Sequence, residues 1–148
     1  MKGSRSAPDT SSPRNRDAVG GDLAAAARAC AGNSACLAIS GNFSARVDAS
    51  SILITAAGID KAACTANNLV LVNLGGEPLG VAAPSSDTEL HLAIYALEPA
   101  TGAVMHEHSV ASTVVSRLGG KELIFEGYEL AKAFAGITSH RARLALPI

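Results

Sequence analysis

Two histidines separated by one residue, His106 and His108, are the strongest sign of chemistry in this sequence. They follow small and apolar residues at 102–105, a pattern typical of a buried strand with the two histidines at its end. Side chains two apart on a strand share one face, so both imidazoles can reach one ion while Glu107 points away. A catalytic zinc ion usually has three protein ligands and one open position. The pattern predicts two zinc ligands, and the alternative is two ordinary polar residues at a strand end.

Three short loops carry groups that suit an anion. Residues 40–42 combine a glycine, which allows a close backbone approach, with serine and asparagine side chains. Residues 58–61 form a small-residue loop with a lysine, and residues 85–86 are serines before an expected helix, whose first amides can bind phosphate. Each loop alone is equally an ordinary turn, a hairpin end or a helix N-cap. The candidate phosphate ligands are Ser40, Gly41, Asn42, Gly58, Lys61, Ser85 and Ser86.

Three further ionisable residues have ordinary roles as their simplest interpretation. His91 lies one position off the apolar stripe of an expected helix, so we expect it to be exposed or to cap. His140 follows two hydroxyl residues in a loop, where a solvated side chain is expected. Glu129 is placed at a helix start, where the helix dipole favours a carboxylate.

Composition limits the class of protein. The chain has 148 residues, of which 48% are hydrophobic, and a formal net charge of −1, so a single domain without a nucleic-acid surface is expected. No apolar run approaches the roughly 18 residues of a membrane span, and no secretory signal is visible. The cysteines Cys30, Cys36 and Cys64 lack CxxC spacing, so we expect small buried side chains in a reducing, cytoplasmic setting.

The hydrophobic pattern predicts a mixed α/β fold in which helices cover a largely antiparallel sheet. Residues 1–19 are polar, so we expect a disordered tail before a domain over residues 20–148. Helices are expected over 23–31 with Asp22 as the cap, over 88–97 with Leu90, Ile94 and Leu97 buried, and over 110–118 and 129–135. Strands are expected over 43–47, which alternates as a half-buried strand, and over 52–55, 69–74, 102–106, 123–125 and 144–148.

Six phrases in a fixed order resemble those of a known family. They are Ser40–Arg46, Ile52–Gly58, Pro84–Thr88, Ala103–Ser109, Phe125–Lys132 and Gly136–His140. From about Asp22 to Ile148 the chain is similar to the class II aldolase and adducin family, and residues 127–130 resemble its methylthioribulose-1-phosphate dehydratase branch. The resemblance implies a three-layer α/β/α fold whose C-terminal part is missing, because the family's third zinc histidine and last strands do not occur here.

The resemblance also implies roles and partners. His106 and His108 would be two zinc ligands, the seven loop residues a phosphate cradle, and Glu129 the catalytic acid and base. Asp87 stands where many members have a glutamate that acts as a base or lies beside the zinc. The implied substrate is a phosphorylated ketose of methionine salvage, and the assembly implied for an intact version is a homotetramer. Two alternatives remain open: an aldolase for another sugar phosphate, and a non-catalytic, adducin-like assembly domain.

Overall fold

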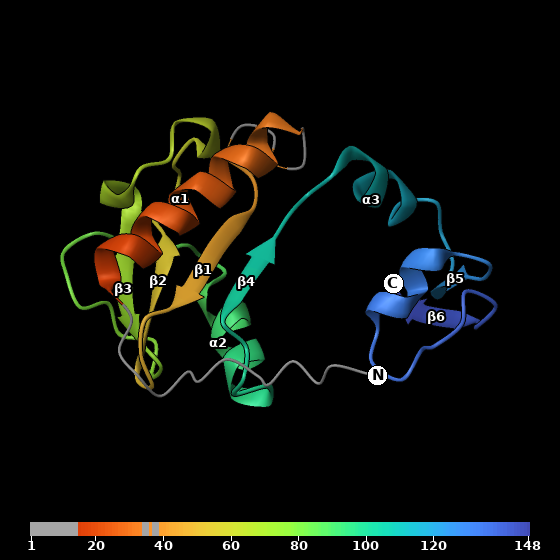
Figure 1. Cartoon of the computed structure of the whole chain (residues 1–148). Coiled ribbons are helices and arrows are strands. Elements are labelled where there is room, and N and C mark those ends of the chain that lie inside the picture. The colour runs from red at the N-terminus through yellow and green to blue at the C-terminus, as the bar shows by residue number, and fades with distance from the viewer. Residues whose placement is uncertain (1–14, 34–35, 37–38) are drawn as a thin grey trace. The chain divides into compact units, whose positions relative to one another are not determined.

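The computed structural model describes residues 15–33, 36 and 39–148, and the chain divides into two compact units, Met1–Val110 and Ala111–Ile148 (Figure 1). The expected tail at residues 1–14 lies outside the described residues. Across the described ranges, none of the helices has both the length and the apolar character needed to cross a bilayer.

The first unit contains a four-stranded antiparallel sheet with strand order β3-β2-β1-β4. The elements in chain order are α1 (Arg16–Gly32), β1 (Asn42–Arg46), β2 (Ser51–Thr55), two 3-10 turns η1 (Lys61–Ala63) and η2 (Ala66–Asn68), β3 (Leu69–Asn73), α2 (Thr88–Leu97) and β4 (Ala103–His106). The hairpin between β1 and β2 pairs Arg46 with Ile52 and Ser44 with Ile54.

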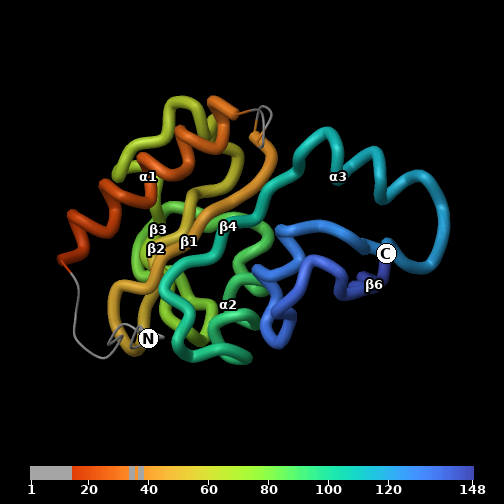
Figure 2. Tube along the Cα trace, turned by 45° about the vertical axis from the view of Figure 1, so that its right-hand side comes forward, coloured from red at the N-terminus to blue at the C-terminus, as the bar shows by residue number. Residues whose placement is uncertain are grey.

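Helices cover both faces of this sheet, and in Figure 2 the strands run between α1 and α2. Leu23 and Ala27 of α1 pack against a core that includes Phe43 and Leu53. On the opposite face, Tyr95 of α2 packs with a second core cluster. That cluster contains Ile52, Ile54, Val70, Val72 and Val104. Alternate residues of β2 and β3 therefore pack in different cores, and the expected α/β/α layering is confirmed.

The prediction of a half-buried β1 is wrong, because all five residues of the strand are buried. Phe43 and Ala45 face the α1 core, while the polar Ser44 and Arg46 are buried as well. Arg46 donates from Nε to the Thr101 carbonyl (3.1 Å), and its guanidinium lies 4.8 Å from the centre of the Tyr95 ring. Partners on the α2 side thus compensate for the buried polar groups, as burial requires.

Two helices differ from their predicted form. α1 begins at Arg16 rather than Leu23, and its cap is Asn15, whose side chain accepts from the Asp17 and Ala18 amides; Asp22 lies inside the helix. Residues 16–19, assigned to the tail from composition, are therefore helical.

α2 has the expected length but a different buried face. Thr88, His91 and Tyr95 are buried, whereas Leu90 is 49% and Leu97 is 85% exposed. The polar stripe of α2 faces the sheet, so the predicted apolar stripe of Leu90, Ile94 and Leu97 is wrong for two of its three members.

The second unit contains the helix α3 (Val110–Val115) at its junction with the first, the antiparallel pair β5 (Glu122–Phe125) and β6 (Leu144–Pro147), and the 3-10 helix η3 (Glu129–Ala133). The α-helix predicted over 129–135 is therefore a shorter 3-10 helix. The helix predicted over 110–118 ends as an α-helix at Val115. Phe125 and Tyr128 pack edge to face, 5.8 Å between ring centres.

Candidate functional site

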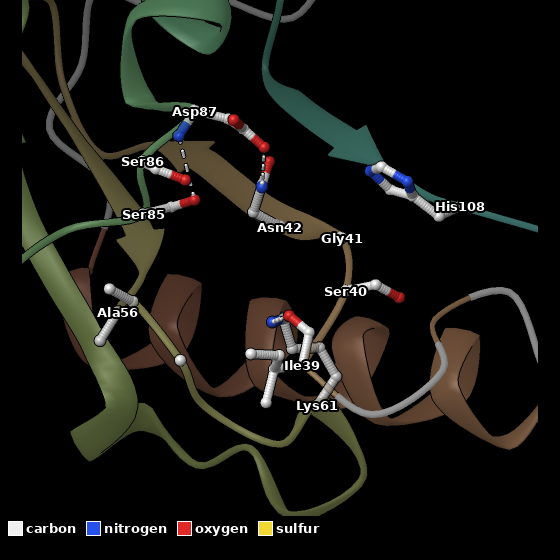
Figure 3. Close-up of a pocket in the computed structure, with 12 residues that line it drawn as sticks. Ile39, Ser40, Gly41, Asn42, Ala56, Lys61, Ser85, Ser86, Asp87 and His108 are labelled. Carbon is white, nitrogen blue, oxygen red and sulfur yellow. Dashed lines mark hydrogen bonds between the residues drawn. The ribbon is translucent and has the colours of Figure 1, made fainter.

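The seven residues predicted to bind phosphate all line one pocket of about 250 Å³ in the first unit (Figure 3). They come from three separate places in the chain: the entry to β1, the loop after β2, and the loop before α2. His108 lines the same pocket, and so do Ile39, Ala56, Ala57 and Asp87. The structure therefore brings together loops that the sequence identified independently.

Gly41 is required by backbone geometry at the entry to β1. Its φ is +73°, a left-handed conformation that L side chains rarely adopt. A Cβ at this position would lie 2.7 Å from the His106 carbonyl oxygen and 2.7 Å from the Cys36 sulfur. The absence of a side chain therefore lets the first pocket loop pack directly against the end of β4. Gly58 also has a positive φ, +70°, but open space surrounds it.

Lys61 is buried with 2% of its surface exposed, which excludes the alternative of a solvated lysine. Its Nζ donates to the carbonyls of Ile39 (2.6 Å) and Ile59 (3.1 Å), and Figure 3 shows it beside Ile39 at the pocket. Burial lowers the pKa of Lys61 below its usual value. An ammonium has three donors, so two bonds to carbonyls leave one for an anion in the pocket.

Asp87 precedes α2 but does not cap it with its carboxylate. Its Oδ2 accepts instead from Asn42 Nδ2 (2.7 Å), as Figure 3 shows, and lies 3.2 Å from His106 Nδ1. The hydrogen bond from Asn42 is the main reason that the pKa of Asp87 is lowered, and the nearby His106 adds to it. Ser85 holds the turn, because its Oγ accepts from the Asp87 amide and its carbonyl from the Thr88 hydroxyl (2.6 Å).

The two candidate zinc ligands lie side by side. The rings of His106 and His108 are 4.6 Å apart between centres, with 42° between their planes, so the two side chains do not point in opposite directions. Glu107 hydrogen-bonds to the Cys30 thiol. Burial and this carboxylate together raise the pKa of Cys30 to about 11. The strand itself is not buried as predicted: β4 is an edge strand, and Met105 is 56% exposed.

The donor set of this pair fits zinc only in part. Imidazole suits zinc, and the contact of His106 Nδ1 with the Asp87 carboxylate is the arrangement that leaves Nε2 available to a metal. Within the described ranges, however, no three His, Cys, Asp or Glu side chains come together as a metal site. The described residues thus supply two ligands where a catalytic zinc commonly has three.

The predicted catalytic residue, Glu129, belongs to the second unit. It is the first residue of η3, its side chain is 72% exposed, and it forms an ion pair with Lys132. Its Oε2 also lies 3.6 Å from Nδ1 of His140, which is half exposed. His140 therefore pairs with the carboxylate rather than standing free in solvent.

Sequence reasoning missed His91. It was expected at the surface, yet it is fully buried between α2 and β1, with Nε2 2.6 Å from Asn42 Oδ1 and Nδ1 2.7 Å from Ser44 Oγ. Burial lowers its pKa to about 4. The signal that identifies it is the spacing of Thr88, His91 and Tyr95, which places the three on one helical face.

Some known proteins are similar to this chain in sequence, and others are similar to it in fold. The model of the class II aldolase and adducin N-terminal domain matches residues 21–145. The methylthioribulose-1-phosphate dehydratase of Pectobacterium carotovorum is 45% identical over 116 residues, which are 76% of this chain and 56% of that protein. The enzyme of the same name from Acidiphilium cryptum is 43% identical over 113 residues, covering 75% and 54%.

Among solved structures, the YgbL protein of Escherichia coli superposes with a TM-score of 0.71 at 26% identity, over 76% of this chain and 56% of that one. The chain thus spans about half the length of the curated relatives it matches. The matched family model covers most of the chain, including every residue that lines the pocket. The chain belongs to the class II aldolase and adducin family.

Proposed function

We propose that this chain carries the phosphate cradle and part of the metal site of a zinc-dependent dehydratase acting on 5-methylthioribulose 1-phosphate. The product would be 2,3-diketo-5-methylthiopentyl 1-phosphate, a step of methionine salvage. The proposal is carried by one observation: three loops with anion-binding character line a single pocket together with His108. It is supported by relatives at 43–45% identity that bear the dehydratase name.

The pocket has the chemistry of a phosphate site. Gly41 and Gly58 bring backbone amides close to a ligand, and Ser40, Ser85 and Ser86 supply hydroxyl groups. The remaining donor of Lys61 adds a positive charge, and its two bonds to carbonyls hold that charge in place. Such a site recognises the phosphate end of a sugar through several donors at once.

His106 and His108 would hold the zinc ion. Zinc at this position would supply Lewis acidity to a ketone oxygen of the substrate. The carboxylate of Asp87 would orient the His106 ring through Nδ1, since a carboxylate beside a ligand histidine fixes its tautomer.

Glu129 would move protons in the reaction. Dehydration removes a proton from the carbon next to the ketone and a hydroxide from the next carbon, and the resulting enol becomes the diketone. As the base, Glu129 would accept the proton from the carbon next to the ketone, and as the acid it would return that proton to the leaving hydroxide, which then departs as water. Positioned general acid–base groups commonly contribute about 10²–10⁴-fold.

The test is turnover of 5-methylthioribulose 1-phosphate by the chain loaded with zinc, followed by mass spectrometry for a product that has lost one water. Glu129→Gln should reduce turnover by about 10²-fold or more, because the amide cannot transfer a proton. Glu126→Gln is the matched control, since it makes the same change three residues earlier in the same unit. Equal rates for the two variants would remove Glu129 from the mechanism.

Two other functions are distinguished by the same experiment. Cleavage of a sugar phosphate into two carbon fragments would indicate an aldolase. A chain that binds no zinc would favour the adducin-like assembly role. Zinc content before and after His106→Ala separates specific from adventitious metal, with Glu107→Ala as the control.

We also propose that the protein assembles as a homotetramer in the cytoplasm. Exposed apolar side chains such as Leu97 and Leu130 support an assembly, and three free cysteines support a reducing compartment. Sedimentation equilibrium tests the tetramer.

A further inference from the structure

We propose that His91 is a positioning residue of the pocket: it fixes the orientation of the Asn42 amide and, through Asn42, the position of the Asp87 carboxylate. The inference rests on the proposed function only where it takes the pocket as a phosphate site. His91 itself does not line the pocket.

The hydrogen bonds around Asn42 determine which end of its amide points where. Asn42 Nδ2 lies 2.7 Å from Asp87 Oδ2, and an ionised carboxylate only accepts, so the nitrogen of the amide faces Asp87. Asn42 Oδ1 therefore faces His91 Nε2 at 2.6 Å. Because a carbonyl oxygen cannot donate, His91 Nε2 must carry the proton.

The rest of the chain of hydrogen bonds follows from that assignment. A neutral imidazole with its proton on Nε2 has Nδ1 as an acceptor, so the Ser44 hydroxyl donates to it across 2.7 Å. The single proton of Ser44 is then used, and the Tyr95 hydroxyl donates to Ser44 across 2.9 Å. The donors run in one direction, from Tyr95 through Ser44, His91 and Asn42 to the carboxylate of Asp87.

His91 differs from the other groups around this amide, which are Asp87 and His106; His106 Nδ1 lies 3.3 Å from Asn42 Oδ1. His106 and Asp87 have 29% and 39% of their side chains exposed, so both can exchange partners when a ligand enters. His91 is fully buried on α2 and cannot turn toward the pocket. It therefore provides a fixed point that holds the Asn42 side chain whether or not the pocket is occupied.

Two substitutions separate positioning from simple packing. In His91→Gln the amide nitrogen can reach the place of Nε2 and still donate to Asn42. In His91→Asn the shorter side chain reaches only the place of Nδ1, beside Ser44, and leaves Asn42 Oδ1 without this donor. The measurements are the affinity of the folded chain for inorganic phosphate by calorimetry and the free energy of unfolding of each variant.

We expect His91→Asn to weaken phosphate binding about tenfold, the effect of losing one hydrogen bond, and His91→Gln to stay within about threefold of the original affinity. Equal affinities in all three proteins, or equal losses in both variants, would overturn the inference. A role in packing alone lowers the stability of both variants and leaves the affinity of the folded fraction unchanged.

Nitrogen NMR of the unsubstituted chain tests the same inference without any variant. We expect the Nε2–H form of His91 and two well separated, slowly exchanging proton signals from the Asn42 amide. A proton on Nδ1 instead of Nε2 would overturn the inference. If the original chain binds no phosphate, the phosphate-site proposal fails, and the NMR result alone then decides the role of His91.

Discussion

Replacing Gly41 with alanine should destabilise the first unit strongly, because two separate costs add at this position. Placing an L residue at φ +73° costs about 1–2 kcal/mol. The new Cβ would also lie 2.7 Å from the His106 carbonyl oxygen, a backbone atom held in the pairing of β1 with β4. Overpacking of this kind costs about 1–3 kcal/mol, so the total should be about 2–5 kcal/mol.

Gly58→Ala is the matched control. Gly58 has nearly the same φ, +70°, yet no atom lies within 4 Å of its added Cβ, so only the conformational cost of about 1–2 kcal/mol applies. Urea unfolding, followed through the amide signals of β1 and β2, gives both free energies. The difference between the two variants measures the clash with the His106 carbonyl oxygen and the Cys36 sulfur together. Equal losses of stability would refute the argument that this loop packs directly on the end of β4.

Three further predictions concern buried groups. Burial lowers the pKa of His91 to about 4, so as the pH falls the unfolded chain takes up a proton near pH 6.5 and the folded chain only near pH 4. The free energy of unfolding should therefore fall by about 3 kcal/mol as the pH is lowered between these two values. His91→Gln should remove this part of the pH dependence in urea titrations. Lys61→Met should weaken phosphate binding at least tenfold and loosen the loops at Ile39 and Ile59, which hydrogen exchange can detect as faster amide exchange there. Phe43→Ala should cost about 3–5 kcal/mol in urea unfolding, since the ring is fully buried, and a loss below about 1 kcal/mol would show that the α1 core does not depend on it.

The layers of the fold could be predicted from the sequence, but which faces of β1 and α2 are buried could not. The strand Asn42–Arg46 alternates apolar and polar residues, which in isolation predicts one face in water. The pattern cannot show that a second helix will cover the polar face. Ser44 and Arg46 are buried there because α2 and the residues before β4 provide their partners.

The candidate site was predicted from a different kind of signal. Glycine, serine and lysine in a short loop suggest anion binding by themselves, so each loop can be identified from its local sequence alone. That the three loops lie together is shown only by the structure. His91 was not recognisable, because its role depends on a contact with Asn42, which lies 49 positions away in the sequence. By hydrophobicity, Leu90 rather than His91 is expected to be buried. In the structure, hydrogen bonds to β1 determine which face of α2 packs on the sheet.

The polar layer between β1 and α2 links the stability of the fold to the geometry of the pocket. Burying Ser44, His91 and Tyr95 would be unfavourable without partners, but each side chain has one, and the described residues contain no buried side-chain nitrogen or oxygen without a hydrogen bond. A fully paired buried network permits only one arrangement of donors and acceptors. An apolar layer of the same volume could hold α2 against the sheet equally well, but it would leave Asn42 Oδ1 without its buried donor, His91 Nε2. The position of the Asp87 carboxylate therefore depends on hydrogen bonds that begin in the interior of the protein.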